Sequence, residues 1–424
     1  MADKSGKLGL WLIGATGNVA TTIAVGLAAL RRNHHAPLGM LTEQAPLNEL
    51  PLRPLNAITI GGHEISSRTL RQSAEALHRG SRIFDADLLD AVAGDLRAIQ
   101  KNIRTGRTLG CGRSITDLAT RKDANRTTTA RAVIDAVRAD LRAFQRRNKL
   151  DRVVVINVAS TEPRFAPKKS HGAWTSLSRA LTQKSSPLPA SSLYAIAAIE
   201  AGMPYVNFTP SLGAGVPAIR ELAESARVPI MGADGKTGET LLKTVLAPMF
   251  RDRHLPIDSW VGHNVLGNGD GLVLDSAANK SSKLDTKNGV IHSITGYQPQ
   301  VRTTIEYVES LGDWKTAWDH VHFRGFLDTR MTLQFVWQGC DSILAAPLVL
   351  DLARLADYHA AMNRGGVMKH LACFFKAPMD VREHEFAAQV KMLNDYAEHD
   401  LREKRGATAR SGTGRATRRR SPKK

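Results

Sequence analysis

The chain has 424 residues, and its 58 lysine and arginine side chains exceed its 40 aspartate and glutamate side chains by a formal charge of +18. Residues 91–150 and 402–424 each carry +9, whereas the remainder of the chain is neutral. This distribution argues against a general polyanion-binding protein, whose positive charge would spread over a binding face. The length suggests two domains or one large composite domain, with 42% hydrophobic residues to form a core.

The cysteines and the N-terminus point to a reducing compartment. The three cysteines are widely spaced: Cys111, Cys340 and Cys373. They provide neither a disulfide framework nor a paired zinc site. The apolar run over residues 8–15 follows two lysines, as in an export signal, but it is too short to span a membrane. We therefore expect a cytoplasmic protein with no metal and no membrane contact.

The first predicted element is a strand over Leu8–Ile13, which leads through a turn of small residues into a helix over Thr21–Arg32. In such a turn, backbone N–H groups approach a pyrophosphate, and the helix N-terminus adds partial positive charge. The turn departs from G-x-G-x-x-G because Thr16 and Ala20 replace the second and third glycines. An ordinary strand–helix connection is the alternative. The candidate cofactor-binding residues here are Gly14, Thr16, Gly17, Asn18 and Val19.

Two further apolar runs predict buried parallel strands, over Arg152–Asn157 and Pro204–Phe208. The polar residues that follow them, beginning with Ala159, are expected to face the crevice in which open α/β sheets bind ligands. A helix is predicted over Thr128–Asn148. After residue 401 the sequence has no periodicity and predicts a disordered basic tail over residues 402–424.

Glycine-broken sequence between residues 230 and 271 predicts two segments that face a ligand. Thr237 is predicted to cap a helix whose first turn would present free amides to a phosphate monoester. Alternate glycines in residues 263–271 predict a loop that brings Asn264, Asn268 and Asp270 close to a ligand. A simple capped helix and an ordinary β-turn are the alternatives. The candidate phosphate ligands at this helix start are Thr237, Gly238, Glu239 and Thr240.

Four lysines carry the predicted chemistry. Lys283 and Lys287 would share one helix face, where like charges repel unless an anion lies between them. Lys376 has apolar neighbours that favour the neutral amine, and Lys315 follows a Gly-Asp-Trp segment. Asp341 begins an apolar helix and could hold a lysine in place. Lysines and aspartates without a metal cluster or a Ser-His-Asp arrangement suggest carbonyl and enolate chemistry on a phosphorylated substrate.

The order of these segments resembles the myo-inositol-1-phosphate synthases, NAD-dependent enzymes that cyclise glucose 6-phosphate. The resemblance covers roughly residues 8–380. It rests on the turn at residues 14–22, Ala159-Ser-Thr-Glu162, Asn207–Pro217, Gly232–Lys243, Asn264–Gly271, the Lys283/Lys287 pair, Gly312-Asp-Trp-Lys315, Asp341 and Lys376. No single motif is decisive, but their order and separations together are specific.

The resemblance implies the α/β class and a homotetramer. A Rossmann-type NAD-binding domain would cover residues 7–240, and an α+β catalytic and tetramerisation domain would cover residues 241–344. Residues 345–401 would return to the first domain, ahead of the tail at 402–424. The basic tail would bind nucleic acid only non-specifically.

The resemblance also implies the reaction, which leads from glucose 6-phosphate to 1D-myo-inositol 3-phosphate. A hydride passes from C5 of the open-chain sugar to NAD+, a proton leaves C6, the enolate attacks the C1 aldehyde, and the hydride returns to C5. Lys283 would move the proton of the C5 hydroxyl, while Lys315 and Lys376 would bind oxygens that become anionic. Lys287 would hold the phosphate together with the amides of residues 237–240. The carboxylates implied to orient lysines or the nicotinamide are Asp234, Asp270 and Asp341.

Departures from the family pattern leave the substrate open. Glu239 stands where relatives have glutamine, and a carboxylate there would disfavour phosphate unless it points away. Glu64 is assigned the acidic role on the adenosine side of the cofactor. One alternative is an NAD-dependent enzyme that acts on another phosphosugar. The other is a non-enzymatic protein that binds polyanions through its basic tail.

Overall fold

The computed structural model describes residues 6–126, 128–183, 185–267 and 290–413, with the side chains of residues 406–413 excepted. The larger sheet contains β1 (Leu8–Ile13), β2 (Ile58–Glu64), β3 (Ile103–Thr105), β4 (Arg152–Asn157), β5 (Tyr205–Asn207), β6 (Pro229–Gly232) and β11 (Gly366–Val367). The helices around it are α1 (Asn18–Arg31), α2 (Leu70–Ser81), α3 (Ala86–Ala91), α4 (Ala93–Gln100), α5 (Arg113–Thr116), α6 (Ala130–Arg147), α7 (Trp174–Ala180), α8 (Ala190–Glu200), α9 (Pro217–Ser225), α13 (Asp341–Ala361) and α14 (Phe386–Thr413).

The larger sheet is parallel throughout and has the strand order β11-β6-β5-β4-β1-β2-β3. Its central strands are buried on both faces, as their continuous apolar sequences predict. Helices α1, α2, α4 and α13 contact one another on one side, and α6, α8 and α9 lie together on the other. The chain therefore has the predicted α/β class, and the order of the strands reverses between β1 and β4.

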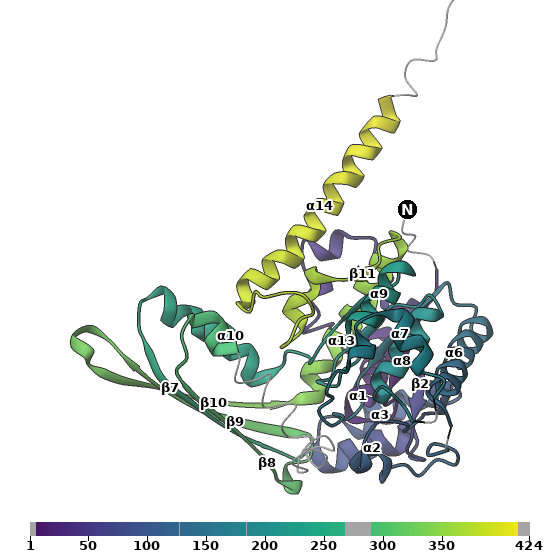
Figure 1. Cartoon of the computed structure of the whole chain (residues 1–424), viewed down its shortest axis with the longest axis horizontal. Coiled ribbons are helices and arrows are strands. Elements are labelled where there is room, and N and C mark those ends of the chain that lie inside the picture. The colour runs from purple at the N-terminus through teal and green to yellow at the C-terminus, as the bar shows by residue number, and fades with distance from the viewer. Residues whose placement is uncertain (1–5, 127, 184, 268–289, 414–424) are drawn as a thin grey trace, which may run out of the picture.

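A smaller mixed sheet has the order β10-β9-β7-β8 and extends away from the larger one (Figure 1). Its strands are β7 (Ile257–Leu266), β8 (Gln300–Tyr307), β9 (Trp314–Arg324) and β10 (Arg330–Cys340), and α10 (Gly238–Asp252) accompanies them. Phe250 of α10 packs against Trp260 and Phe323, which gives this part of the chain its own apolar core. The predicted α+β segment is thus a separate sheet, while the domain boundaries at residues 240 and 344 stay a prediction.

The predicted loop over residues 263–271 begins too early. Residues 263–266 belong to β7, which pairs with β8 on one side and β9 on the other through Leu266. Backbone pairing on both sides holds this segment in a strand, so Asn264 lies in the sheet and is buried. Asn268 and Asp270 lie outside the described residues.

Helix α13 returns the chain from the smaller sheet to the larger one. Its Asp357 accepts hydrogen bonds from Arg53 and Arg152, at 3.4 and 2.5 Å, and its Asp351 accepts one from the backbone N–H of Thr42 at 3.2 Å. These bonds satisfy carboxylates that are almost fully buried, so the packing of α13 depends on them.

Helix α14 projects away from the body and extends into the segment predicted to be a disordered tail (Figure 1). The predicted start at residue 402 is too early, because residues 402–413 are helical. Arg402 pairs with Glu398 one turn earlier, and Arg405 reaches Glu49 of the body at 3.1 Å, which favours continuation of the helix. Residues 414–424 lie outside the described residues. In the described part of the chain, no helix is both long and apolar enough to cross a bilayer.

We expect the attachment of α14 to weaken in acid. Tyr396 of this helix contacts His359 at 3.0 Å and stacks on His370 at 3.7 Å, and burial lowers the pKa of these histidines to about 4 and about 3. In the unfolded chain these two histidines bind protons below about pH 6.5, whereas in the folded chain they do so only below about pH 4. The free energy of unfolding therefore falls as the pH drops through this window. The loss should reach roughly 3 kcal/mol for each histidine by about pH 4. Denaturant unfolding at several pH values measures it. His370→Phe keeps the stacking and should flatten the dependence; equal slopes would contradict this account.

Candidate active site

Most of the predicted site residues that the structure describes line a pocket of about 330 Å³ at the carboxyl edge of the larger sheet, whereas Thr16, Gly238, Glu239 and Thr240 do not. It lies where the strand order reverses, with the starts of β9 and α13 on its other side. The predicted residues that line it are Gly14, Gly17, Asn18, Val19, Glu64, Ala159, Asp234, Thr237, Lys315, Asp341 and Lys376. Asn268, Asp270, Lys283 and Lys287 lie outside the described residues.

The turn between β1 and α1 forms one wall of this pocket. Gly14 has a φ of +87°, and a Cβ there would lie 2.9 Å from the Cα of Ala159, so this position requires glycine. Gly17 precedes α1 and no side chain caps the helix, which leaves its first amides open to an anion. Glu64 accepts hydrogen bonds from the backbone N–H groups of Thr16 and Ser66, at 2.8 and 2.9 Å, and so holds the turn against the end of β2.

Lys376 and Asp234 form a buried ion pair on the opposite wall. The ammonium nitrogen lies 2.9 Å from Asp234 Oδ1, and the two residues are 7% and 3% exposed. Their backbones are joined as well, because the N–H of Lys376 donates to the carbonyl of Asp234 at 2.7 Å and residue 235 bridges to residue 375. The carboxylate therefore holds a charged amine in a place that would otherwise disfavour it.

Lys315 reaches the same pocket from β9, and its ammonium lies 4.0 Å from Asp341 Oδ2 at the start of α13. Asp313, which was not predicted as a site residue, joins these segments to the first turn of α1. It accepts hydrogen bonds from Asn18 Nδ2 at 2.7 Å and from the N–H of Ser342 at 3.2 Å. Burial raises the pKa of Asp313. Its position in the Gly-Asp-Trp-Lys segment was the available signal, but only the fold brings residue 18 to it.

The start of α10 has the properties of a phosphate cradle. Thr237 precedes the helix without donating or accepting a capping hydrogen bond, and Gly238 has a φ of +57°. Thr240 is buried, and its hydroxyl has no hydrogen-bond partner among the described residues. A helix start that is both buried and uncapped leaves N–H and O–H donors that an anion would satisfy.

The carboxylate of Glu239 points away from this cradle. It lies 2.6 Å from Lys243, whose ammonium is also 3.8 Å from Asp319, and all three side chains are completely buried. Asp319 accepts a hydrogen bond from the indole of Trp260 at 2.7 Å. The carboxylate of Glu239 is thus turned toward Lys243 and away from the open amides at the start of α10.

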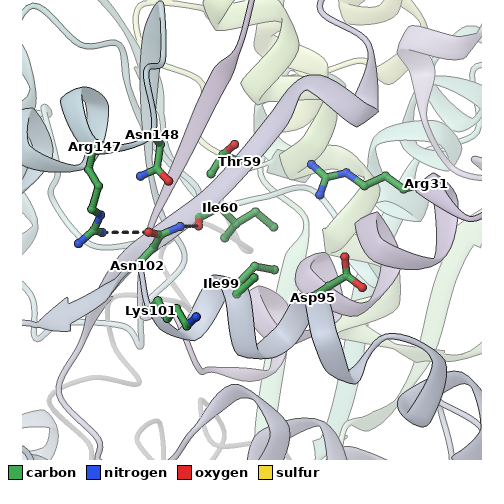
Figure 2. Close-up of a pocket in the computed structure, with 10 residues that line it drawn as sticks. Arg31, Thr59, Ile60, Asp95, Ile99, Lys101, Asn102, Arg147 and Asn148 are labelled. Atoms are coloured by element: carbon green, nitrogen blue, oxygen red, sulfur yellow. Dashed lines mark hydrogen bonds between the residues drawn. The ribbon is translucent and has the colours of Figure 1, made fainter.

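A second pocket, of about 480 Å³, lies at the opposite edge of the sheet, beside the start of β2 (Figure 2). Its cations come from the C-terminal ends of three helices: Arg31 of α1, Lys101 after α4 and Arg147 of α6. Cations stabilise the negative end of a helix dipole. This placement accounts for part of the charge of residues 91–150 without a ligand, and the pocket contains none of the predicted site residues.

Among the described residues, one group of three side chains has the spacing of metal ligands: His399, Asp400 and Glu403. It lies on α14, and Asp400 is already paired with Arg364 at 2.8 Å. This group therefore does not belong to the candidate active-site pocket between the larger sheet and the start of β9.

A family model for myo-inositol-1-phosphate synthase, which describes an NAD-binding domain, matches residues 8–397. The chain belongs to the myo-inositol-1-phosphate synthase family. It is 32% identical over 403 residues to inositol-3-phosphate synthase 1 of Bacteroides thetaiotaomicron, an alignment that covers 90% of this chain and 91% of the relative. Identity to inositol-3-phosphate synthase 1 of Oryza sativa subsp. japonica is 29% over 387 residues, covering 83% and 74% of the two chains.

Solved structures show the same synthase fold. Inositol-3-phosphate synthase of Caenorhabditis elegans superposes with a TM-score of 0.82 at 23% identity, covering 92% of this chain and 85% of that one. A myo-inositol-1-phosphate synthase-related protein of Thermotoga maritima superposes with a TM-score of 0.76 at 22% identity, covering 92% and 98%. The resemblance recognised in the sequence is therefore confirmed at the level of family and fold.

Gly14→Ala should lower the affinity for NADH at least about tenfold, because the new Cβ meets Ala159 and the left-handed backbone becomes strained. Gly26→Ala is the matched control within α1, since no atom lies within 4 Å of a Cβ there. The control should bind normally and gain up to about 1 kcal/mol of stability. NADH fluorescence titration measures both, and equal affinities for the two variants would contradict the assignment of this turn.

Lys243→Met should destabilise the fold by about 3–5 kcal/mol, because Glu239 and Asp319 would lose the cation that they share. Lys391→Met is the control, since that side chain is 72% exposed and pairs with Asp395 on the surface. It should change stability by less than about 0.5 kcal/mol. Denaturant unfolding compares the two, and similar midpoints would show that the buried carboxylates do not need Lys243.

Proposed function

We propose that this protein is an NAD-dependent inositol-3-phosphate synthase that converts glucose 6-phosphate to 1D-myo-inositol 3-phosphate. The observation that carries the proposal is the convergence of Lys315 and Lys376, each beside a carboxylate, on one pocket with the glycine turn. The uncapped start of α10 adjoins the same pocket through Thr237. A pocket with a dinucleotide turn, a phosphate cradle and two buried lysines matches the requirements of this reaction.

The cofactor would lie along the turn between β1 and α1. Gly14, Gly17, Asn18 and Val19 line the pocket there, and Ala159 faces them from the end of β4. Bound NAD would accept a hydride from the sugar and return it later, so that the overall reaction is redox-neutral. We assign Glu64 to the adenosine side, because it closes the pocket at the end of β2 and also holds the backbone of Thr16.

The sugar phosphate would bind at the start of α10. The amides of residues 238–240 and the hydroxyl of Thr240 are donors for which the described residues supply no capping side chain. Phosphate at a helix N-terminus gains hydrogen bonds and a favourable interaction with the dipole. By resemblance to the family, Asn268 and Lys287 complete this site.

The two lysines of the pocket would stabilise oxyanions on the sugar. A ketone at C5 makes the C6 proton acidic, and both enolisation and attack on the C1 aldehyde place negative charge on oxygen. Ammonium groups of Lys315 and Lys376 would donate hydrogen bonds to these oxygens, and such bonds are strongest in a dry site. Asp341 and Asp234 hold the lysines in place. By resemblance, Lys283 moves the proton of the C5 hydroxyl and Asp270 orients the cofactor.

The proposal includes a homotetramer assembled through the smaller sheet, in the cytoplasm. Strand β10 lies at the edge of that sheet and exposes Val336 by 65% and Met331 by 38%. Exposed apolar strand edges favour association. The cytoplasm is supported by three cysteines that are buried and form no disulfide.

Purified protein incubated with glucose 6-phosphate and NAD+ should form inositol phosphate without net NADH. Lys376→Met should lower kcat by about 10²–10³, because an oxyanion loses its charged donor. Phosphate release from the inositol product after periodate oxidation, or direct chromatography, measures turnover. Lys391→Met serves as the control and should keep full activity. Turnover of another sugar phosphate in its place would overturn the choice of substrate while keeping the site.

A further inference from the structure

Lys236 lies close to the Asp234–Lys376 ion pair but does not face the pocket. It belongs to residues 233–237, here called the strap, which follow β6 and carry Asp234. Asp234, Gly235 and Thr237 line the pocket, whereas the side chain of Lys236 points away from it. Lys236 is only 3% exposed, so its ammonium group is held inside the protein.

The ammonium group of Lys236 fastens the strap to the start of α14. It donates a hydrogen bond to Gln389 Oε1 and lies 5.8 Å from the centroid of the Phe386 ring. Gln389 is fully buried, and its own amide donates to the carbonyl of Glu383 at 2.5 Å. The strap and α14 are therefore joined by one buried lysine whose acceptor is itself fixed.

The surroundings of Lys236 contain little negative charge. Among the described residues its ammonium forms no ion pair, and burial lowers its pKa to about 8. The titratable groups that face it are Cys373, Glu383, His384 and Lys376. Burial raises the pKa of the Cys373 thiol to about 12, so it supplies no charge near neutral pH. Glu383 offsets part of this charge from a distance, but no described carboxylate pairs with the ammonium directly, so burial of this cation is costly.

The backbone connects Lys236 to the catalytic lysine. Its N–H donates to the carbonyl of Phe374 at 2.8 Å, and the N–H of Lys376, two residues after Phe374, donates at 2.7 Å to the carbonyl of Asp234, two residues before Lys236. A displacement of the strap at residue 236 would therefore move Asp234 relative to the Lys376 ammonium. The contact that it would break is the 2.9 Å ion pair.

We propose that Lys236 is a positioning residue for the synthase reaction: by fastening the strap to α14, it holds Asp234 in contact with Lys376. The proposal rests on the function proposed above. It makes the start of α14, which lies outside the pocket, a part of the machinery that orients a lysine inside it. The positive charge of Lys236 strengthens this contact, because a neutral amine would form a weaker hydrogen bond to Gln389.

Lys236→Met, Lys236→Arg and the surface control Lys391→Met test this role. Lys236→Met should lower kcat about tenfold while the KM values for glucose 6-phosphate and NAD+ stay within about twofold, since orientation and not ground-state binding is lost. Lys236→Arg keeps a charged donor and should recover at least about half of the rate. The wild-type kcat should fall as the pH rises through about 8, and neither Lys236 variant should show this step.

Hydrogen exchange separates this inference from the proposed function. In Lys236→Met, without substrate, the amides of residues 386–393 should exchange faster than in the wild type and in Lys391→Met. Faster exchange in a protein that does not turn over glucose 6-phosphate would support the fastening and refute the function. An unchanged kcat, an unchanged pH step or unchanged exchange in Lys236→Met would each overturn the inference.

Discussion

The parallel direction of the larger sheet is the constraint on which the rest of the structure depends. Six crossover connections make all strands of that sheet run in the same direction, so their carboxyl ends lie at one edge of the sheet. Turns separated by more than a hundred residues therefore meet there. Gly14, Ala159 and Asp234 follow β1, β4 and β6, and they line one pocket for this reason alone. Helix α13 then brings the smaller sheet back to the same edge and supplies the second wall.

Burial of lysine is the second constraint, and it explains the distribution of carboxylates. Lys243 has Glu239 and Asp319, Lys376 has Asp234, and Lys315 has Asp341 at a longer distance. A nearby carboxylate offsets much of the free energy that a lysine loses when it is removed from water. The two lysines at the pocket have one carboxylate each, whereas Lys243 lies between two.

The excess positive charge of the chain has little to do with this chemistry. Arg31, Lys101 and Arg147 sit at C-terminal ends of helices on the far edge of the sheet, where they complement helix dipoles. Part of the basic C-terminal segment continues α14 and pairs with acidic neighbours, as Arg402 does with Glu398. Most of the net charge lies on the surface, whereas Lys315 and Lys376 are buried beside carboxylates that offset their charge.

Local sequence determined the elements and their order. Leu8–Ile13 and Arg152–Asn157 are predicted and observed with the same bounds, because continuous apolar runs between turn residues permit little else. The order of the motifs identified the family. Tertiary structure alone decided that Asp319 joins the local Glu239–Lys243 pair, that Asp313 meets Asn18, and that Arg405 of α14 reaches Glu49. Each of these outcomes depends on partners distant in the sequence or on the far side of a helix, and pairing over such distances leaves no periodic pattern that a sequence could display.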